Sequence, residues 1–189
     1  SNSEITMPSI YILRHEIRGK EATYDSLLTA RGMSNAVALT PRLAKLDIRT
    51  IYCSPFLRAI QTIHPYATKY NIPINIDYSL LEFIETSEIL PSIYWMQLVN
   101  DDLSYWNIND NYQSVTNHKH LSIGDGRTET NTDVRYRANT FLQFLRSHFN
   151  HQKGNILVVS HKTLLCHLWD LVHKKKRNLE MGEIDCLLK

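Results

Sequence analysis

The sequence has no long hydrophobic run and little excess charge of either sign. No apolar segment approaches the roughly 20 residues that a membrane-spanning helix needs, and no signal-peptide pattern opens the chain. The formal net charge of +2 is too small to indicate binding to nucleic acid or to a membrane surface. These absences favour a cytoplasmic protein with neither a nucleic-acid nor a membrane partner.

Cysteine is scarce, with three residues at Cys53, Cys166 and Cys186. Their spacing matches no metal site, and three thiols cannot all pair within one chain, so we expect them to be reduced. His118 and His120 have metal-ligand side chains, but no cysteine or carboxylate cluster completes a site around them. The sequence therefore predicts neither a metal nor another cofactor.

The chain has the size and composition of one ordinary globular domain. Its 189 residues are 43% hydrophobic and 21% charged, which is enough to bury a sizeable core. Residues 83–132 differ from the rest, because they are rich in Asn, Asp, Ser and aromatics and show no long periodicity. We interpret 1–189 as a single domain in which 83–132 is an insertion or lid over the active-site edge. The oligomeric state stays open between monomer and homodimer.

Three short apolar runs, at 9–13, 48–53 and 156–160, are rich in β-forming residues. Their apolar character is continuous rather than alternating, which is typical of strands covered on both faces in a parallel sheet. Helical patterns lie between them. These expected strands and helices indicate a three-layer α/β/α fold with a central, mostly parallel sheet.

The helical patterns carry recognisable start and stop signals. Thr29 is expected to cap the first helix, and Pro41 to break or restart it. Ser54-Pro55 reads as a capping serine followed by proline at the first helical position. Further apolar stripes run over 134–149 and after Ser160-His161.

Polar residues come directly after the expected strands. Arg14 and His15 follow the first, Arg58 lies shortly after the second, and His161 follows the last. Ligands of open α/β sheets bind beyond the carboxyl ends of the strands, so we expect these four side chains to meet at one edge. Arg18 could join them from the loop after His15.

Two arginines and two histidines at one edge predict phosphoryl transfer. The planar fork of arginine donates two parallel hydrogen bonds to phosphate and keeps its charge at any working pH. A neutral imidazole can attack phosphorus and carry the group covalently. The surrounding cations stabilise charge on the transferring group, and they lower the pKa of the attacking histidine. We therefore expect an anion pocket that contains His15 as a nucleophile.

Five short motifs appear in order along the chain, and together they resemble the histidine phosphatase superfamily, with its phosphoglycerate mutase-like fold. The resemblance runs from about Ile10 to His167 and leaves 83–132 unmatched. The motifs are Leu13-Arg14-His15, Leu28-Thr29-x-x-Gly32, Ser54-Pro55-x-x-Arg58-Ala59-x-Gln61-Thr62, Leu80-x-Glu82 and Val158-Val159-Ser160-His161.

The resemblance implies a role for each matching residue. His15 would be the phosphorylated nucleophile, and Arg14, Arg58 and His161 would bind the phosphoryl oxygens. Glu82 falls where the family has its proton donor, which protonates the leaving oxygen and then activates water. Such a carboxyl group needs a raised pKa, which its apolar neighbours would favour and the arginines oppose.

Four neighbouring positions leave alternatives open. Glu16 and Lys162 stand where the family usually has glycine, so Glu16 could narrow the substrate range and Lys162 could contact phosphate or point to solvent. Arg18 resembles the second arginine of the Arg-His-Gly-x-Arg form in the acid phosphatase branch, which also binds phosphate. Glu85 is the alternative acid, one helical turn from Glu82.

The resemblance implies a metal-independent phosphomonoesterase of the histidine acid phosphatase type. We expect its substrate to be a small phosphorylated metabolite or, as a second choice, a phosphoprotein. One alternative is a phosphoglycerate-type mutase, which the shortness of the chain and the lack of an obvious basic cluster in 83–132 disfavour. Another is a weakly active phosphate- or protein-binding module of the same fold.

Overall fold

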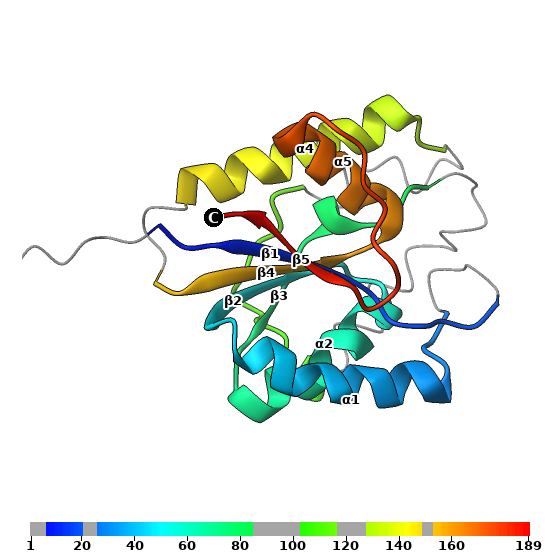
Figure 1. The fold of residues 1–189 in the computed structure, drawn as a ribbon, viewed down its shortest axis with the longest axis vertical. Helices are drawn as coiled ribbons and strands as arrows, with labels where there is room; N and C mark the ends of the chain where they lie inside the picture. The colour runs from blue at the N-terminus through cyan, green and yellow to red at the C-terminus, as the bar shows by residue number, and fades with distance from the viewer. Residues whose placement is uncertain (1–6, 21–25, 85–102, 117–127, 149–152) are drawn as a thin grey trace, which may run out of the picture.

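A central sheet organises the molecule (Figure 1). The computed structural model describes residues 7–20, 26–84, 103–116, 128–148 and 153–189. Within them the sheet has five strands in the order β3-β2-β4-β1-β5. The strands are β1 (Ile10–Arg14), β2 (Ile48–Cys53), β3 (Ile74–Ile76), β4 (Asn155–Ser160) and β5 (Ile184–Leu188).

The sheet is mostly parallel, as the continuous apolar runs predicted. β4 lies between β1 and β2 and is parallel to both, β3 is parallel to β2, and β5 is antiparallel to β1 at the far edge. Arg14 pairs with Ser160 and Cys53 with Val159. Because these partners end their strands together, the chain leaves β1, β4 and β2 side by side.

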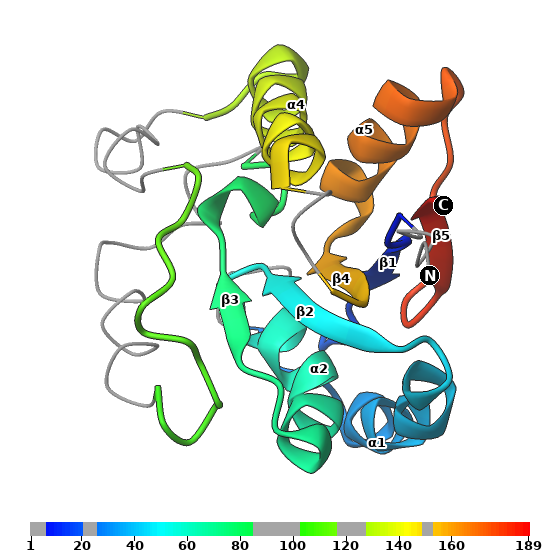
Figure 2. The same ribbon diagram turned by 90° about the vertical axis from the view of Figure 1, so that its left-hand side faces the viewer.

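Two pairs of helices cover the two faces of the sheet (Figure 2). α1 and α2 pack with one side of the sheet into a core that includes Leu13, Ile51 and Val159. α4 and α5 pack on the other side, around Ile12 and Val158. The predicted three-layer α/β/α fold is confirmed. The helices are α1 (Ala30–Ala44), α2 (Leu57–Tyr70), α4 (Asn131–His148), α5 (Lys162–His173) and the 3₁₀ turn η1 (Tyr78–Leu80).

The helix ends confirm one sequence signal and correct two. Thr29 caps α1, where its hydroxyl accepts from the Gly32 N–H. α1 continues through Pro41, contrary to the prediction, and the proline lies on the exposed side of the helix where water can replace the lost backbone bond. α2 begins at Leu57 rather than at Pro55. The hydroxyl of Ser54 accepts from Phe56 and contacts a histidine instead of capping the helix.

Part of the segment 83–132 packs on the core along the outer edge of β3. Ile108 forms a bridge with Ile74, and Leu103 and Trp106 pack against the α1–α2 core. Tyr112 packs against the core on the other face. Residues 85–102 and 117–127 lie outside the described residues, so the lid over the active-site edge stays a prediction.

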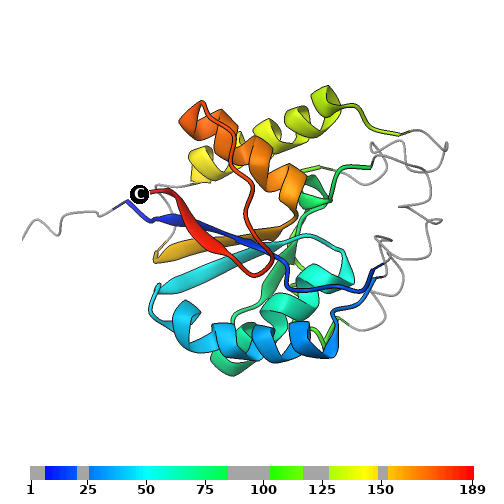
Figure 3. The same cartoon turned by 45° about the vertical axis from the view of Figure 1, so that its right-hand side comes forward.

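The chain returns to the sheet after α5 by the loop 174–183, which leads into β5 (Figure 3). This loop runs close to the carboxyl end of β1, because the Gly182 N–H donates to the carbonyls of Arg14 and His15. No helix among the described residues is long and apolar enough to cross a membrane. All three cysteines are free thiols.

Candidate active site

His15 follows β1 and is almost completely buried. Its backbone N–H donates to the Ser160 carbonyl at 3.1 Å, and its ring Nδ1 lies 2.7 Å from the Glu16 carbonyl oxygen. A carbonyl oxygen can only accept, so Nδ1 carries the hydrogen. Nε2 of a neutral His15 ring therefore carries the free lone pair.

The surroundings of His15 keep this ring neutral. Burial, and after it the positive charges of Arg58, Arg14 and Arg18, lower the pKa of His15 to about 3. The bond to Glu16 acts in the opposite direction. At neutral pH the imidazole is therefore an unprotonated base with one nitrogen available for attack.

His161 lies beside His15, with 5.2 Å between the ring centroids, at the N-cap of α5. Its Nε2 lies 2.8 Å from the Ser54 hydroxyl, which already accepts from the Phe56 N–H at 3.2 Å. The Ser54 hydroxyl still has its hydrogen and a second lone pair, and where it donates to Nε2 a neutral His161 carries its hydrogen on Nδ1.

When Nδ1 of His161 carries the hydrogen, it is a buried donor with no acceptor among the described residues. Burial, and then the charge of Arg58, holds the pKa of His161 well below its usual value, so the ring is neutral. Nδ1 has no hydrogen-bond partner in the part of the chain that the structure describes. A buried N–H without a partner is costly, and an anionic ligand in the site would satisfy it.

Two arginines add positive charge to the same site. Arg58 is buried at the start of α2, with its guanidinium carbon 4.7 Å from the centroid of the Phe56 ring. Burial lowers the pKa of Arg58 to about 10, which leaves it charged at neutral pH. Arg14 donates from Nη1 to the Leu179 carbonyl at 2.8 Å, and its buried Nε has no partner among the described residues.

Glu82 reaches this site from the segment after η1. Its carboxylate accepts from the Phe83 N–H at 2.8 Å, and the N–H groups of Thr163 and Leu164 in the first turn of α5 lie near enough to lower its pKa. Burial raises the pKa of Glu82, although these N–H groups and the charge of Arg58 oppose the shift. A carboxyl group with a raised pKa next to His161 is suited to hold a proton for transfer.

The remaining candidates lie at the margin of the site. Arg18 donates to the Gly19 carbonyl in its own loop at 2.9 Å, yet its charge contributes to the lowered pKa of Arg58. Lys162 is exposed at the first position of α5. Glu85 lies outside the described residues.

Glu16 is buried, and its carboxylate is held within the loop after β1. It accepts from the Ile17 N–H at 3.2 Å and from Asn35 on α1 at 3.3 Å. A Cβ added at Gly182 would lie 2.0 Å from the same carboxylate, which would have to move, and the φ of +74° there also favours glycine. The negative charge of Glu16, which lies beside the expected anion pocket, is therefore stabilised by two N–H donors.

The sequence analysis missed Arg137 and Glu129, which form a buried ion pair beside Glu82. A signal was present, because Arg137 interrupts the apolar stripe formed by Val134, Ala138 and Phe141 on α4. A charged residue on the buried face of a helix needs a partner.

No group of three or more His, Cys, Asp or Glu side chains among the described residues could hold a metal ion. The pair His118 and His120 lies outside those residues. The expectation that no cofactor is needed stays a prediction.

The fold and the site define a three-layer α/β protein in which a neutral histidine lies among cationic and N–H donors. The model of the histidine phosphatase superfamily (branch 1) matches residues 10–183, and the chain belongs to that superfamily. No curated protein matches the chain in sequence.

Solved structures share this fold. The ecdysone phosphate phosphatase of Bombyx mori, bound to tungstate, is 15% identical over 94% of this chain and 87% of its own, with a TM-score of 0.67. A mycobacterial glucosyl-3-phosphoglycerate phosphatase is 16% identical over 95% and 89%, with a TM-score of 0.66. A putative α-ribazole-5′-phosphate phosphatase of Escherichia coli is 25% identical over 88% and 80%, with a TM-score of 0.61.

Proposed function

We propose that this protein hydrolyses phosphomonoesters through a phosphohistidine on Nε2 of His15. The observation that carries the proposal is the 2.7 Å bond from Nδ1 of His15 to the Glu16 carbonyl. It fixes the tautomer, and a pKa of about 3 keeps the ring unprotonated. Both conditions are needed for an imidazole to act as a nucleophile.

In the first step, Nε2 of His15 attacks phosphorus and the bond to the ester oxygen breaks. Arg14, Arg58 and the Nδ1–H of His161 bind the phosphoryl oxygens and stabilise their charge in the transition state. Glu82 gives its proton to the leaving oxygen, so an alcohol departs and Glu82 becomes a carboxylate.

In the second step, the carboxylate of Glu82 takes a proton from water as the water oxygen attacks phosphorus. The bond between phosphorus and Nε2 breaks, and inorganic phosphate leaves with His15 and Glu82 in their starting states. Arg18, whose charge acts on His15 and Arg58, is a further phosphate-binding residue in this proposal.

The substrate that we propose is a small phosphorylated metabolite rather than a phosphoprotein. Support comes from the named substrates of similar structures, such as glucosyl-3-phosphoglycerate and α-ribazole-5′-phosphate, which are small phosphate esters. A panel of sugar phosphates, nucleotides and phosphopeptides, assayed by phosphate release, tests this choice.

The mechanism is tested with p-nitrophenyl phosphate in EDTA, comparing wild type with His15→Ala. We expect loss of at least about 10⁴-fold in kcat for His15→Ala, because the covalent route is gone. Acid-quenched wild-type enzyme should carry acid-labile phosphate on His15. Equal turnover by the two proteins, or wild-type activity that EDTA abolishes, would contradict the proposal.

A further inference from the structure

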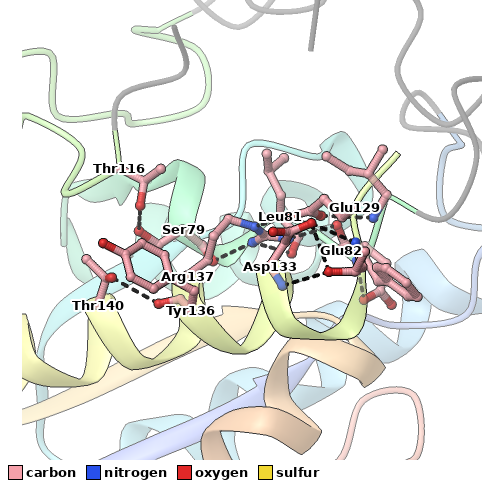
Figure 4. Close-up of polar contacts among 12 residues, drawn as sticks. Ser79, Leu81, Glu82, Thr116, Glu129, Asp133, Tyr136, Arg137 and Thr140 are labelled. Carbon is pink, nitrogen blue, oxygen red and sulfur yellow. Dashed lines mark hydrogen bonds and ion pairs between the residues drawn. The ribbon is translucent and has the colours of Figure 1, made fainter. Parts of the chain in front are cut away.

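The Arg137 side chain reaches from α4 to the main chain around Glu82 (Figure 4). Its side chain is only 4% exposed. Nη1 donates to the carbonyls of Ser79 at 2.7 Å and Leu81 at 3.1 Å, and Nη2 donates to the carbonyl of Glu82 itself at 3.2 Å. One guanidinium therefore binds three carbonyls within four residues.

Glu129 holds Arg137 and the other side of the same segment. Its two carboxylate oxygens accept from Nε and Nη2 of Arg137 at 2.7 and 2.8 Å, in the bidentate geometry that is strongest for this pair. One of these oxygens also accepts from the Ile84 N–H at 3.0 Å, and the Glu129 N–H donates to the Ile84 carbonyl at 2.8 Å. The two residues thus bind the chain on both sides of Glu82.

The segment that carries Glu82 has little regular structure to fix it. Residues 81–84 belong to no helix or strand, so their carbonyls have no ladder partners. The Ser160 hydroxyl donates to the Leu80 carbonyl at 2.7 Å, which ties η1 to the end of β4 next to His161. Without Arg137, three carbonyls of the segment would lose a buried charged donor.

We infer that Arg137, held by Glu129, is a positioning residue that keeps the carboxyl group of Glu82 at the N-terminus of α5. This inference rests on the proposed function, in which Glu82 protonates the leaving oxygen. Proton transfer needs donor and acceptor within hydrogen-bond reach, so a small displacement of the Glu82 backbone weakens acid catalysis. The hydrogen bonds of Arg14 to Leu179 and of His161 to Ser54 lie outside this segment.

The test measures kcat/KM over a series of phosphate esters whose leaving groups range from 2,4-dinitrophenol to an alkyl alcohol. A good leaving group departs without a proton, whereas an alkoxide needs the acid. For Arg137→Lys, which keeps the charge but loses the fork, we expect kcat/KM to fall roughly 10- to 100-fold with the alkyl ester and less than about threefold with the dinitrophenyl ester. A merely structural loss of active enzyme would lower both values equally.

Arg135→Lys is the matched control, because Arg135 is also on α4 and forms a 2.7 Å ion pair, with Asp170. We expect it to keep the wild-type dependence on the leaving group. If Arg137→Lys does not fold, Glu129→Asp, which keeps the charge but shortens the side chain, is measured in the same way. An unchanged dependence on the leaving group in a folded variant, or loss of folding in both, overturns the inference.

Glu82→Gln separates this failure from failure of the proposed function. If Glu82→Gln loses activity selectively toward the alkyl ester and Arg137→Lys does not, Glu82 is the acid and the inference alone is wrong. If Glu82→Gln shows the wild-type dependence on the leaving group, the acid role itself is wrong. In neither of these two outcomes would Arg137 keep its positioning role.

Discussion

The two sides of the candidate site, one around His15 and the other around Glu82, are built in different ways. On the His15 side, the contacts are made with main-chain groups. The His15 N–H donates to the Ser160 carbonyl, and the His15 ring binds the Glu16 carbonyl. The Gly182 N–H donates to the carbonyls of Arg14 and His15. On the Glu82 side, two buried charged side chains bind the chain. Substitutions of side chains should therefore disturb the acid more readily than the nucleophile.

Arg58 acts on both sides, and among the substitutions that test this comparison its loss should have the largest effect. Arg58→Met removes a charge that lowers the pKa values of His15, His161 and Glu82 and that, in the proposed mechanism, stabilises the transferring group. We expect kcat/KM for p-nitrophenyl phosphate to fall about 10²- to 10³-fold, the usual loss for one transition-state donor.

Steady-state kinetics measure the Arg58→Met effect, and Arg42→Met, an exposed residue at the end of α1, is the control. A fall in kcat/KM of less than about tenfold would show that Arg58 does not act on both the His15 side and the Glu82 side.

Gly182 tests the main-chain side, with an intermediate effect. Gly182 has a φ of +74°, and an added Cβ would lie 2.0 Å from the Glu16 carboxylate. We expect Gly182→Ala to lower the free energy of unfolding by about 1–3 kcal/mol, and to lower kcat, because the loop that binds the His15 carbonyl must shift. Denaturant unfolding measures the stability.

Two further variants sharpen the Gly182 result. Glu16→Ala combined with Gly182→Ala removes the collision but keeps the strained φ, so part of the stability should return. Gly19→Ala, where an added Cβ meets nothing within 4 Å, should be nearly neutral. Full stability in Gly182→Ala would show that the loop is not a fixed support for His15.

The pH dependence of kcat/KM separates the ionisation of His15 from that of Glu82. It leaves the maximal rate unchanged, so we expect it to be the smallest effect. His15 must be unprotonated, so kcat/KM should rise with pH through its pKa of about 3. Glu82 must be protonated, so kcat/KM should fall as pH rises through its own raised pKa. Comparing Glu82→Gln with wild type on one substrate cancels the ionisation of the substrate. An alkaline limb that is unchanged in Glu82→Gln would assign it to another group.

The contrast between the two sides also explains what the sequence could predict. The strands β1, β2 and β4 were predictable because they are continuous apolar runs, and the residues that follow them were predictable because parallel strands end together. β3 has only three residues, and β5 includes Asp185 and is mostly half-buried, so neither shows a clear pattern.

The supports of the site could not be predicted in the same way. The contacts of Arg137 reach 55 to 58 residues along the chain, and those of Gly182 reach back more than 160. No local period connects such positions. Only the misfit of a charged residue on an apolar helix face indicated that Arg137 had a partner.

The pairing of β1 with β4 and β5 has a consequence for how the protein is made. His15 leaves the ribosome well before its backbone partner Ser160 and the loop at Gly182. Closing such a distant pairing is slow, because the entropy of the long intervening chain is lost before the contact forms. His15 therefore acquires its buried surroundings only after Ser160 and Gly182 have emerged, so a nascent chain that stops before them lacks the complete candidate site.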